Sequence, residues 1–194
     1  VGGGGGGERV GGGLLYVRRV VGGLVGGVLG GAQRCPITVL YRPPKIKLLQ
    51  PLGEAGRGRD RVKLAPANLG GVRLLLKALR RGDAVGILPD QVPAEGEGVW
   101  VDFFGRPAYT MTLAAKLALA TGATILMTAA LRLPHGAGYA LHFTEFTGDP
   151  AGKDGVRALN MAIERTVALE PGQYLWSYNR YKVPSGVAPP APGG

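Results

Sequence analysis

Two charged residues follow short apolar runs at points where prolines fix the direction of the chain. Arg42 comes after the run at 36–41 and precedes two prolines, and Asp90 comes after the run at 84–88 and Pro89. In open α/β sheets, binding and catalytic residues gather where strands end. An arginine and an aspartate held by rigid proline turns at strand ends are reasonable site residues. Alternatively, Arg42 is a surface cation and Asp90 is a turn former, and the residues alone slightly favour these interpretations.

Four further cations alternate along the chain at Arg57, Arg59, Arg61 and Lys63. If this stretch is extended, all four side chains point to the same side, because successive side chains of a strand face opposite ways. The strip is then either a solvated strand edge or a surface that faces phosphates. Both interpretations stay open.

The elements that would position these residues alternate between strand and helix, which predicts one α/β domain with a mixed sheet flanked by helices. Apolar, β-branched runs predict the strands, and apolar residues at helical spacing predict the helices. The predicted strands are 36–41, 84–88, 123–133, 139–146 and 174–182, and the predicted helices are 47–55, 69–81, 111–121 and 154–170.

Residues that favour helix ends fix some of these boundaries. Asn68 is predicted to cap the N-terminus of the helix at 69–81, and Gly82 to end it. Thr110 is predicted to cap the next helix, which Gly122 closes.

The chain changes character near residue 35. Residues 1–35 are glycine-rich and of low complexity, so we expect them to be poorly ordered or translated out of frame. Residues 36–184 form the predicted domain, and 185–194 form a tail rich in proline and glycine.

Composition narrows the class of protein further. Hydrophobic residues make up 45% of the 194 residues, which suits a packed domain, and 23 Lys and Arg against 13 Asp and Glu give a net charge of +10. Such a charge suits binding to nucleic acid, an anionic membrane surface, an acidic carrier protein or a phosphorylated lipid.

Cys35 is the only cysteine, so no internal disulfide forms. The best apolar run, 20–29, is too short to span a bilayer.

Four segments, taken together and in this order, resemble the lipid A biosynthesis acyltransferases, also called Kdo-lipid A lauroyl and myristoyl transferases, of the lysophospholipid acyltransferase superfamily. The resemblance covers about 36–184 and excludes the first 35 residues. The segments are 37–45, 86–91, 103–110 and 173–182.

The resemblance implies transfer of a fatty acyl chain from acyl carrier protein to a hydroxyl of a lipid A precursor. It implies the cytoplasmic face of the bacterial inner membrane as the location and requires no metal or other cofactor. Arg42, Asp90 and Arg180 match family positions, and they are expected to hold the acceptor phosphate or shape the site. In the family a histidine, followed after four residues by Asp or Glu, is the general base.

That motif is missing from its expected place before the strand at 36–41, where residues 20–33 contain neither histidine nor acid. His135 and His142 are followed five positions later by Ala140 and Thr147, so neither replaces it. We expect His135 to be exposed in a turn and His142 to be structural.

We therefore expect an incomplete acyltransferase fold, without the family's N-terminal anchoring helix, from a truncated or diverged gene. This polypeptide is predicted to be inactive, and a non-catalytic protein that binds anionic lipid is the alternative. Nucleic acid is not an expected partner, because charge alone suggests it and no recognition motif accompanies it.

Overall fold

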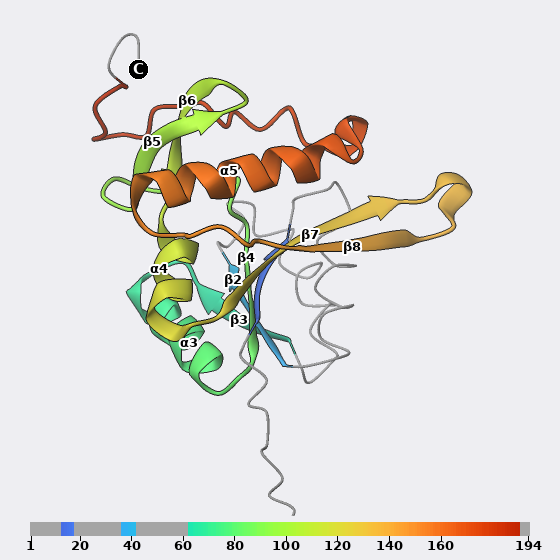
Figure 1. Ribbon diagram of the computed structural model, residues 1–194, viewed down its shortest axis with the longest axis horizontal. Coiled ribbons are helices and arrows are strands. Elements are labelled where there is room, and N and C mark those ends of the chain that lie inside the picture. Colours follow the sequence, from blue (N-terminus) through green and yellow to red (C-terminus); the bar gives the residue numbers. More distant parts are fainter. Residues whose placement is uncertain (1–12, 18–35, 42–61, 191–194) are drawn as a thin grey trace, which may run out of the picture.

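The structure, a computed structural model, describes residues 13–17, 36–41 and 62–190 (Figure 1). Its centre is a six-stranded sheet in the order β3-β2-β4-β1-β7-β8. All neighbouring pairs are parallel except β7 and β8, which are antiparallel. The predicted α/β domain with a mixed sheet is confirmed. The strands are β1 (Gly13–Val17), β2 (Ile37–Tyr41), β3 (Val62–Pro66), β4 (Ala84–Ile87), β7 (Thr124–Arg132) and β8 (Tyr139–Glu145).

Strand β1 lies inside the glycine-rich segment, where we expected no regular structure. It pairs with β4 on one side and β7 on the other, with Tyr16 opposite both Ile87 and Met127. The expectation is therefore wrong for these five residues. The apolar run at 14–17 is short but long enough to fill one position of a parallel sheet, where strands are covered on both faces.

Helix α3 (Leu69–Arg80) packs on β2, β3 and β4. The predicted cap is confirmed, because Asn68 Oδ1 accepts a hydrogen bond of 3.0 Å from the backbone N–H of Gly71. Leu75 and Leu79 are buried in the core. The predicted stop at Gly82 is also confirmed, since this residue has a φ of 84°, which glycine adopts without strain.

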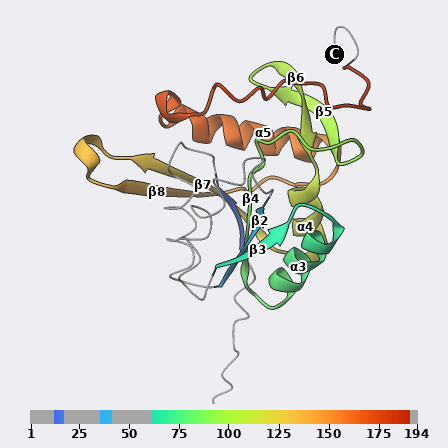
Figure 2. The same cartoon turned by 180° about the vertical axis from the view of Figure 1, so that it is seen from behind.

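A hairpin of β5 (Gly98–Phe103) and β6 (Arg106–Met111) forms a separate two-stranded sheet that the sequence did not predict. Thr110 belongs to β6, so its predicted role as a helix cap is wrong. Helix α4 (Leu113–Thr121) instead begins after Thr112 and ends, as predicted, at Gly122 in the left-handed region. The hairpin lies alongside helix α5 (Gly152–Ala168) in Figures 1 and 2.

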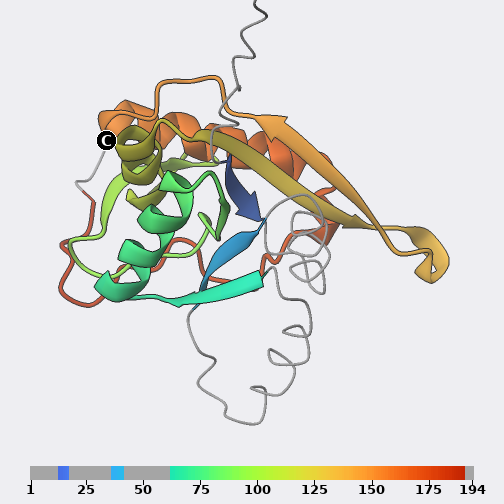
Figure 3. The same ribbon diagram turned by 90° about the horizontal axis from the view of Figure 1, so that it is seen from below.

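Strands β7 and β8 continue past the sheet as a two-stranded ribbon, which projects from the body in all three views (Figures 1 to 3). A short 3-10 helix, η2 (Pro134–Gly136), turns the chain at its tip. His135 lies in this turn and is exposed, as predicted. His142 lies on strand β8, as predicted, and is exposed as well.

Helix α5 (Gly152–Ala168) packs on β5 and β7, and its apolar face points inward as predicted, with Val156, Leu159, Ile163 and Val167 buried. A short 3-10 helix, η3 (Pro171–Gln173), follows. Residues 174–182, here called the C-terminal segment, form turns and bends around one bridge residue, Tyr174. The predicted strand over these residues is therefore wrong.

Candidate functional site

The ends of three neighbouring strands define one edge of the sheet. Because β1, β2 and β4 are parallel and paired, Val17, Tyr41 and Ile87 all end at this edge. Asp90 follows β4 directly. Arg42 follows β2 in the sequence but lies outside the described residues. The topology thus places Asp90 at this edge of the sheet, while the functional roles of Asp90 and Arg42 stay predictions.

Asp90 is almost fully buried, with 5% of its surface exposed. The loop that carries it is attached to the C-terminal segment, because the backbone N–H of Val92 donates a hydrogen bond of 2.9 Å to the hydroxyl of Tyr178. A carboxylate held in such a loop is restricted in direction. Tyr178 is a residue of the site that sequence reasoning missed.

Arg180 is the second predicted site residue with described coordinates, and only 3% of its surface is exposed. Its Nη1 donates to the backbone oxygen of Tyr109 at 2.9 Å, and its Nη2 donates to Thr110 Oγ1 at 2.7 Å. The guanidinium also lies 5.2 Å from the centre of the Phe103 ring. Arg180 therefore joins the C-terminal segment to the β5–β6 hairpin.

The electrostatics of Arg180 connect it to Asp90. Burial lowers the pKa of the guanidinium, while the charges of Tyr174 and Asp90 act in the opposite direction. The structure thus brings two predicted site residues, Asp90 and Arg180, into one buried environment. Both Nη atoms of Arg180 already have protein acceptors, so any contact with a substrate phosphate stays a prediction.

A buried polar residue of α5 completes this network. Asn160 is fully buried, and its Nδ2 donates to Thr110 Oγ1 at 3.1 Å and to the backbone oxygen of Asp102 at 2.8 Å. A buried amide needs such partners because an unpaired polar group costs free energy. Asn160 could have been noticed in the sequence, since it interrupts the apolar face of a predicted helix.

A cavity of about 320 Å³ opens beside the Asp90 loop, between α3, the loop and the start of α4. Its wall is mostly apolar. The polar side chains that line it are those of Asn68, Gln91, Glu97, Thr112 and Lys116. The apolar residues that line it are Leu40, Ala67, Leu69, Val72, Leu88, Val92, Pro93, Met111 and Leu113. Ligand pockets of roughly this size and lining take small apolar molecules.

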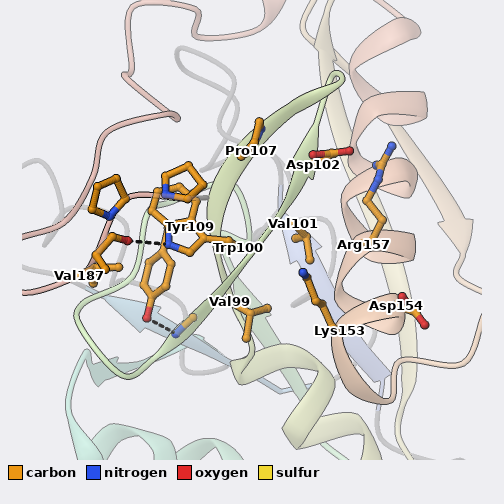
Figure 4. A pocket seen from close by; sticks show the side chains of 14 residues that line it. Val99, Trp100, Val101, Asp102, Pro107, Tyr109, Lys153, Asp154, Arg157 and Val187 are labelled. Atoms are coloured by element: carbon orange, nitrogen blue, oxygen red, sulfur yellow. Dashed lines mark hydrogen bonds between the residues drawn. The ribbon is translucent and has the colours of Figure 1, made fainter. Parts of the chain in front are cut away.

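A larger groove of about 720 Å³ lies on the other side of the hairpin, between β5, the start of α5 and residues 187–190 (Figure 4). Trp100 Nε1 donates to the backbone oxygen of Ala188 at 2.9 Å and so fixes the chain that borders the groove. Unlike the cavity, which Leu88, Gln91, Val92 and Pro93 line, the groove has no lining residue from the loop around Asp90. The groove is thus separate from the edge where the strands end.

The remaining predicted cations and bases do not join this site. Lys63 lies exposed on β3, and Arg57, Arg59 and Arg61 lie outside the described residues. In the described ranges, no three His, Cys, Asp or Glu side chains gather in a way that could hold a metal ion. None of the helices in these ranges is both long enough and apolar enough to cross a membrane.

Known proteins with similar sequences are lipid A biosynthesis acyltransferases. The chain is 30% identical over 162 residues to a lipid A biosynthesis palmitoleoyltransferase of Escherichia coli, covering 82% of this chain and 52% of that protein. It is 30% identical over 153 residues to a lipid A biosynthesis lauroyltransferase of the same organism, covering 76% and 49%. A lipid A biosynthesis acyltransferase of Haemophilus influenzae is 28% identical, with coverages of 77% and 47%. The chain thus spans about half the length of the curated relatives it matches.

The sequence model of a family, the bacterial lipid A biosynthesis acyltransferases, matches residues 24–183. The match starts at residue 24 rather than near residue 36, where the predicted resemblance began. It includes both site residues with described coordinates, Asp90 and Arg180. The chain therefore belongs to the bacterial lipid A biosynthesis acyltransferase family.

Proposed function

We propose that the fold of this chain serves the transfer of a fatty acyl chain from acyl carrier protein to a hydroxyl of a lipid A precursor. Membership of the family is the main support. The single structural observation that favours it is the apolar cavity beside the Asp90 loop, at the edge where β2 and β4 end. An acyl chain is an apolar ligand whose ester must reach polar groups, and a cavity lined by Leu88 and Gln91, the neighbours of the buried Asp90, suits it.

The charge of the chain suits both proposed substrates. A net charge of +10 attracts an acidic carrier protein and a phosphorylated lipid alike. Arg42 and Asp90 are proposed to hold the acceptor, and the C-terminal segment with Arg180 keeps the Asp90 loop in place. A location at the cytoplasmic face of the bacterial inner membrane accompanies this function.

This polypeptide itself is proposed to be inactive. Transfer needs a base to take the proton of the acceptor hydroxyl. The sequence has two histidines, neither followed five positions later by Asp or Glu, and both lie exposed on the β7–β8 ribbon rather than near Asp90. Loss of a general base alone slows such a reaction by about 10²–10⁴-fold.

Incubation with acylated carrier protein and a lipid A precursor tests the inactivity. We expect no acylated product, with the palmitoleoyltransferase of Escherichia coli as the positive control. Robust turnover by this chain would contradict the proposal, because another group would then have to act as the base.

Binding of a fluorescent fatty acid tests the cavity without requiring turnover. Leu113→Trp should fill the cavity and weaken binding, since Leu113 lines it. Leu119→Trp is the matched control, because Leu119 lies on the same helix but is 57% exposed and does not line the cavity. Equal binding by both variants would show that the acyl chain does not enter there.

The alternative function is binding of anionic lipid without catalysis. The basic surface favours it, and loss of the general base would leave it intact. Cosedimentation with anionic vesicles but not neutral ones, together with the absence of turnover, would support this alternative. Retention of the protein by neither kind of vesicle would exclude it.

A further inference from the structure

Two aromatic side chains are exposed side by side at the tip of the β5–β6 hairpin. Phe104 is 41% exposed and Trp176 is 57% exposed, and their ring centres are 5.9 Å apart. Phe104 belongs to the turn of the hairpin and Trp176 to the C-terminal segment. Two large aromatic rings that meet at the surface form an apolar patch, which points to an interaction more strongly than scattered single residues do.

Phe104 has an unfavourable backbone conformation in this turn. Its φ of 49° lies in the left-handed region, which is unfavourable for a bulky side chain. Its backbone N–H donates to Glu164 Oε1 at 2.9 Å, and the hydroxyl of Tyr181 donates to the backbone oxygen of Phe103 at 2.8 Å. A turn that keeps a strained phenylalanine exposed is fixed from two sides, by α5 and by the C-terminal segment.

Two cations and one further apolar residue are exposed on the hairpin and helix that hold Phe104. Arg106 is exposed and stacks on Tyr181, with its guanidinium carbon 4.3 Å from the ring centre. Arg165 is exposed on α5, next to the residue that binds the Phe104 N–H. Met161, one helical turn earlier, is 42% exposed. These five residues, Phe104, Met161, Arg106, Arg165 and Trp176, are called the hairpin-tip patch.

The acidic groups near the patch are few. Glu164 is already bound to Arg157 at 3.0 Å and to the Phe104 N–H. Glu170 is exposed at the end of α5. With Glu164 paired to Arg157, Arg106 and Arg165 outnumber Glu170 among residues 104–106 and 161–170, in line with the net charge of the chain.

We propose that the hairpin-tip patch docks on the surface of an anionic lipid bilayer. Aromatic side chains prefer the boundary between headgroups and acyl chains, and arginines beside them contact lipid phosphates. The indole N–H of Trp176 already donates to the backbone oxygen of Pro171 at 2.9 Å, so burial in lipid leaves no unpaired donor. A stable protein partner would need roughly 20–30 residues on this side, far more than the patch provides.

The proposal names residues different from the basic strip at 57–63. It does not depend on acyl transfer, and it gives the alternative function of lipid binding a specific surface. A failure of the proposed bilayer docking can therefore be distinguished from a failure of the proposed acyl transfer.

The test uses cosedimentation with vesicles of phosphatidylglycerol and of phosphatidylcholine. Phe104→Gly should weaken binding to phosphatidylglycerol vesicles by about tenfold or more, because one aromatic side chain no longer enters the interface. Glycine accepts the positive φ, so the variant should unfold at a denaturant concentration no lower than the original chain does. Phe143→Gly is the matched control, since Phe143 is 49% exposed on β8, away from the patch, and its binding should be unchanged.

A second measurement reports on Trp176 directly. The chain has two tryptophans, so Trp100→Phe leaves Trp176 as the only one. Its emission should shift to shorter wavelength with phosphatidylglycerol vesicles and stay unchanged with phosphatidylcholine. Arg165→Gln removes an exposed positive charge and should weaken binding to phosphatidylglycerol vesicles at low salt, where charges are least screened.

Three results would overturn the proposal. The first is equal binding by the Phe104→Gly and Phe143→Gly variants, in which case lipid binding, if present, uses another surface. The second is an unshifted Trp176 emission in the presence of bound vesicles. The third is equal binding to both kinds of vesicle.

Discussion

The guanidinium of Arg180 donates a 2.7 Å hydrogen bond to the hydroxyl of Thr110, which lies 70 positions earlier in the chain. The same hydroxyl accepts from Asn160 of α5 and donates to the backbone oxygen of Ala108. One buried oxygen thus joins the hairpin, α5 and the C-terminal segment. Because that segment also holds the Asp90 loop through Tyr178, the network fixes the edge of the candidate site.

The first prediction concerns the cost of removing Arg180. Arg180→Met should lower the free energy of unfolding by about 2–4 kcal/mol, because hydrogen bonds to a charged donor are lost and buried acceptors stay unpaired. Arg165→Met, an exposed change on α5, should stay within about 0.5 kcal/mol of the original chain. Unfolding in urea, followed by circular dichroism, measures both. Equal stability of the two variants would mean that Arg180 is not a structural anchor.

The second prediction is that Asn160 and Arg180 act together, since both bind the Thr110 hydroxyl. Asn160→Ala and Arg180→Met should each destabilise the fold. The double variant should differ from the sum of the two effects by about 0.5–3 kcal/mol, as residues of one network do. A double-mutant cycle in urea gives this coupling energy. Strict additivity would contradict a shared network.

Residues with local signals were predicted from the sequence. Asn68 and Gly82 mark the ends of α3, and the apolar spacing of Val156, Leu159 and Ile163 gives the buried face of α5. These features depend on contacts within a few residues. They therefore remain visible without knowledge of the tertiary structure.

The hairpin and the C-terminal segment were not predicted, because their structure depends on distant contacts. The turn of the hairpin is Phe104–Gly105, which lacks the usual Asn-Gly or Asp-Gly signal. Residues 174–182 have the aromatic composition of a strand. However, Tyr178, Arg180 and Tyr181 bind through their side chains to residues 70 to 86 positions away. For the candidate site, Asp90 and Arg180 were predicted from the family resemblance, but their burial was not.

The third prediction concerns stability at high pH. Burial raises the pKa of Tyr181, although Arg106 and Arg180 act to lower it. A phenol with a raised pKa in the folded state contributes stability that is complete below the unfolded pKa of about 10 and is lost as pH rises through the folded value. The free energy of unfolding should thus fall above pH about 10.

Comparison with Tyr181→Phe isolates this contribution. The variant loses the hydrogen bond to Phe103 and should be less stable at pH 8, by about 1 kcal/mol. The difference between the two proteins should shrink as the pH rises through the folded pKa. A constant difference from pH 8 to pH 11 would mean that the Tyr181 proton is not linked to folding.

The fourth prediction separates two adjacent glycines at the start of α3. A Cβ on Gly71 would lie only 1.7 Å from the backbone oxygen of Pro66, whereas a Cβ on Gly70 would approach only the side-chain oxygen of Asn68, at 3.2 Å. Gly71→Ala must therefore push the helix away from the end of β3 and should cost about 3 kcal/mol. Gly70→Ala should change the stability by no more than about 1 kcal/mol, since alanine favours the helix.

Because the cavity beside Asp90 is lined by Leu69 and Val72, Gly71→Ala should also weaken binding of the fluorescent fatty acid, while Gly70→Ala should not. Similar stability for the two alanine variants would show that α3 does not approach β3 this closely.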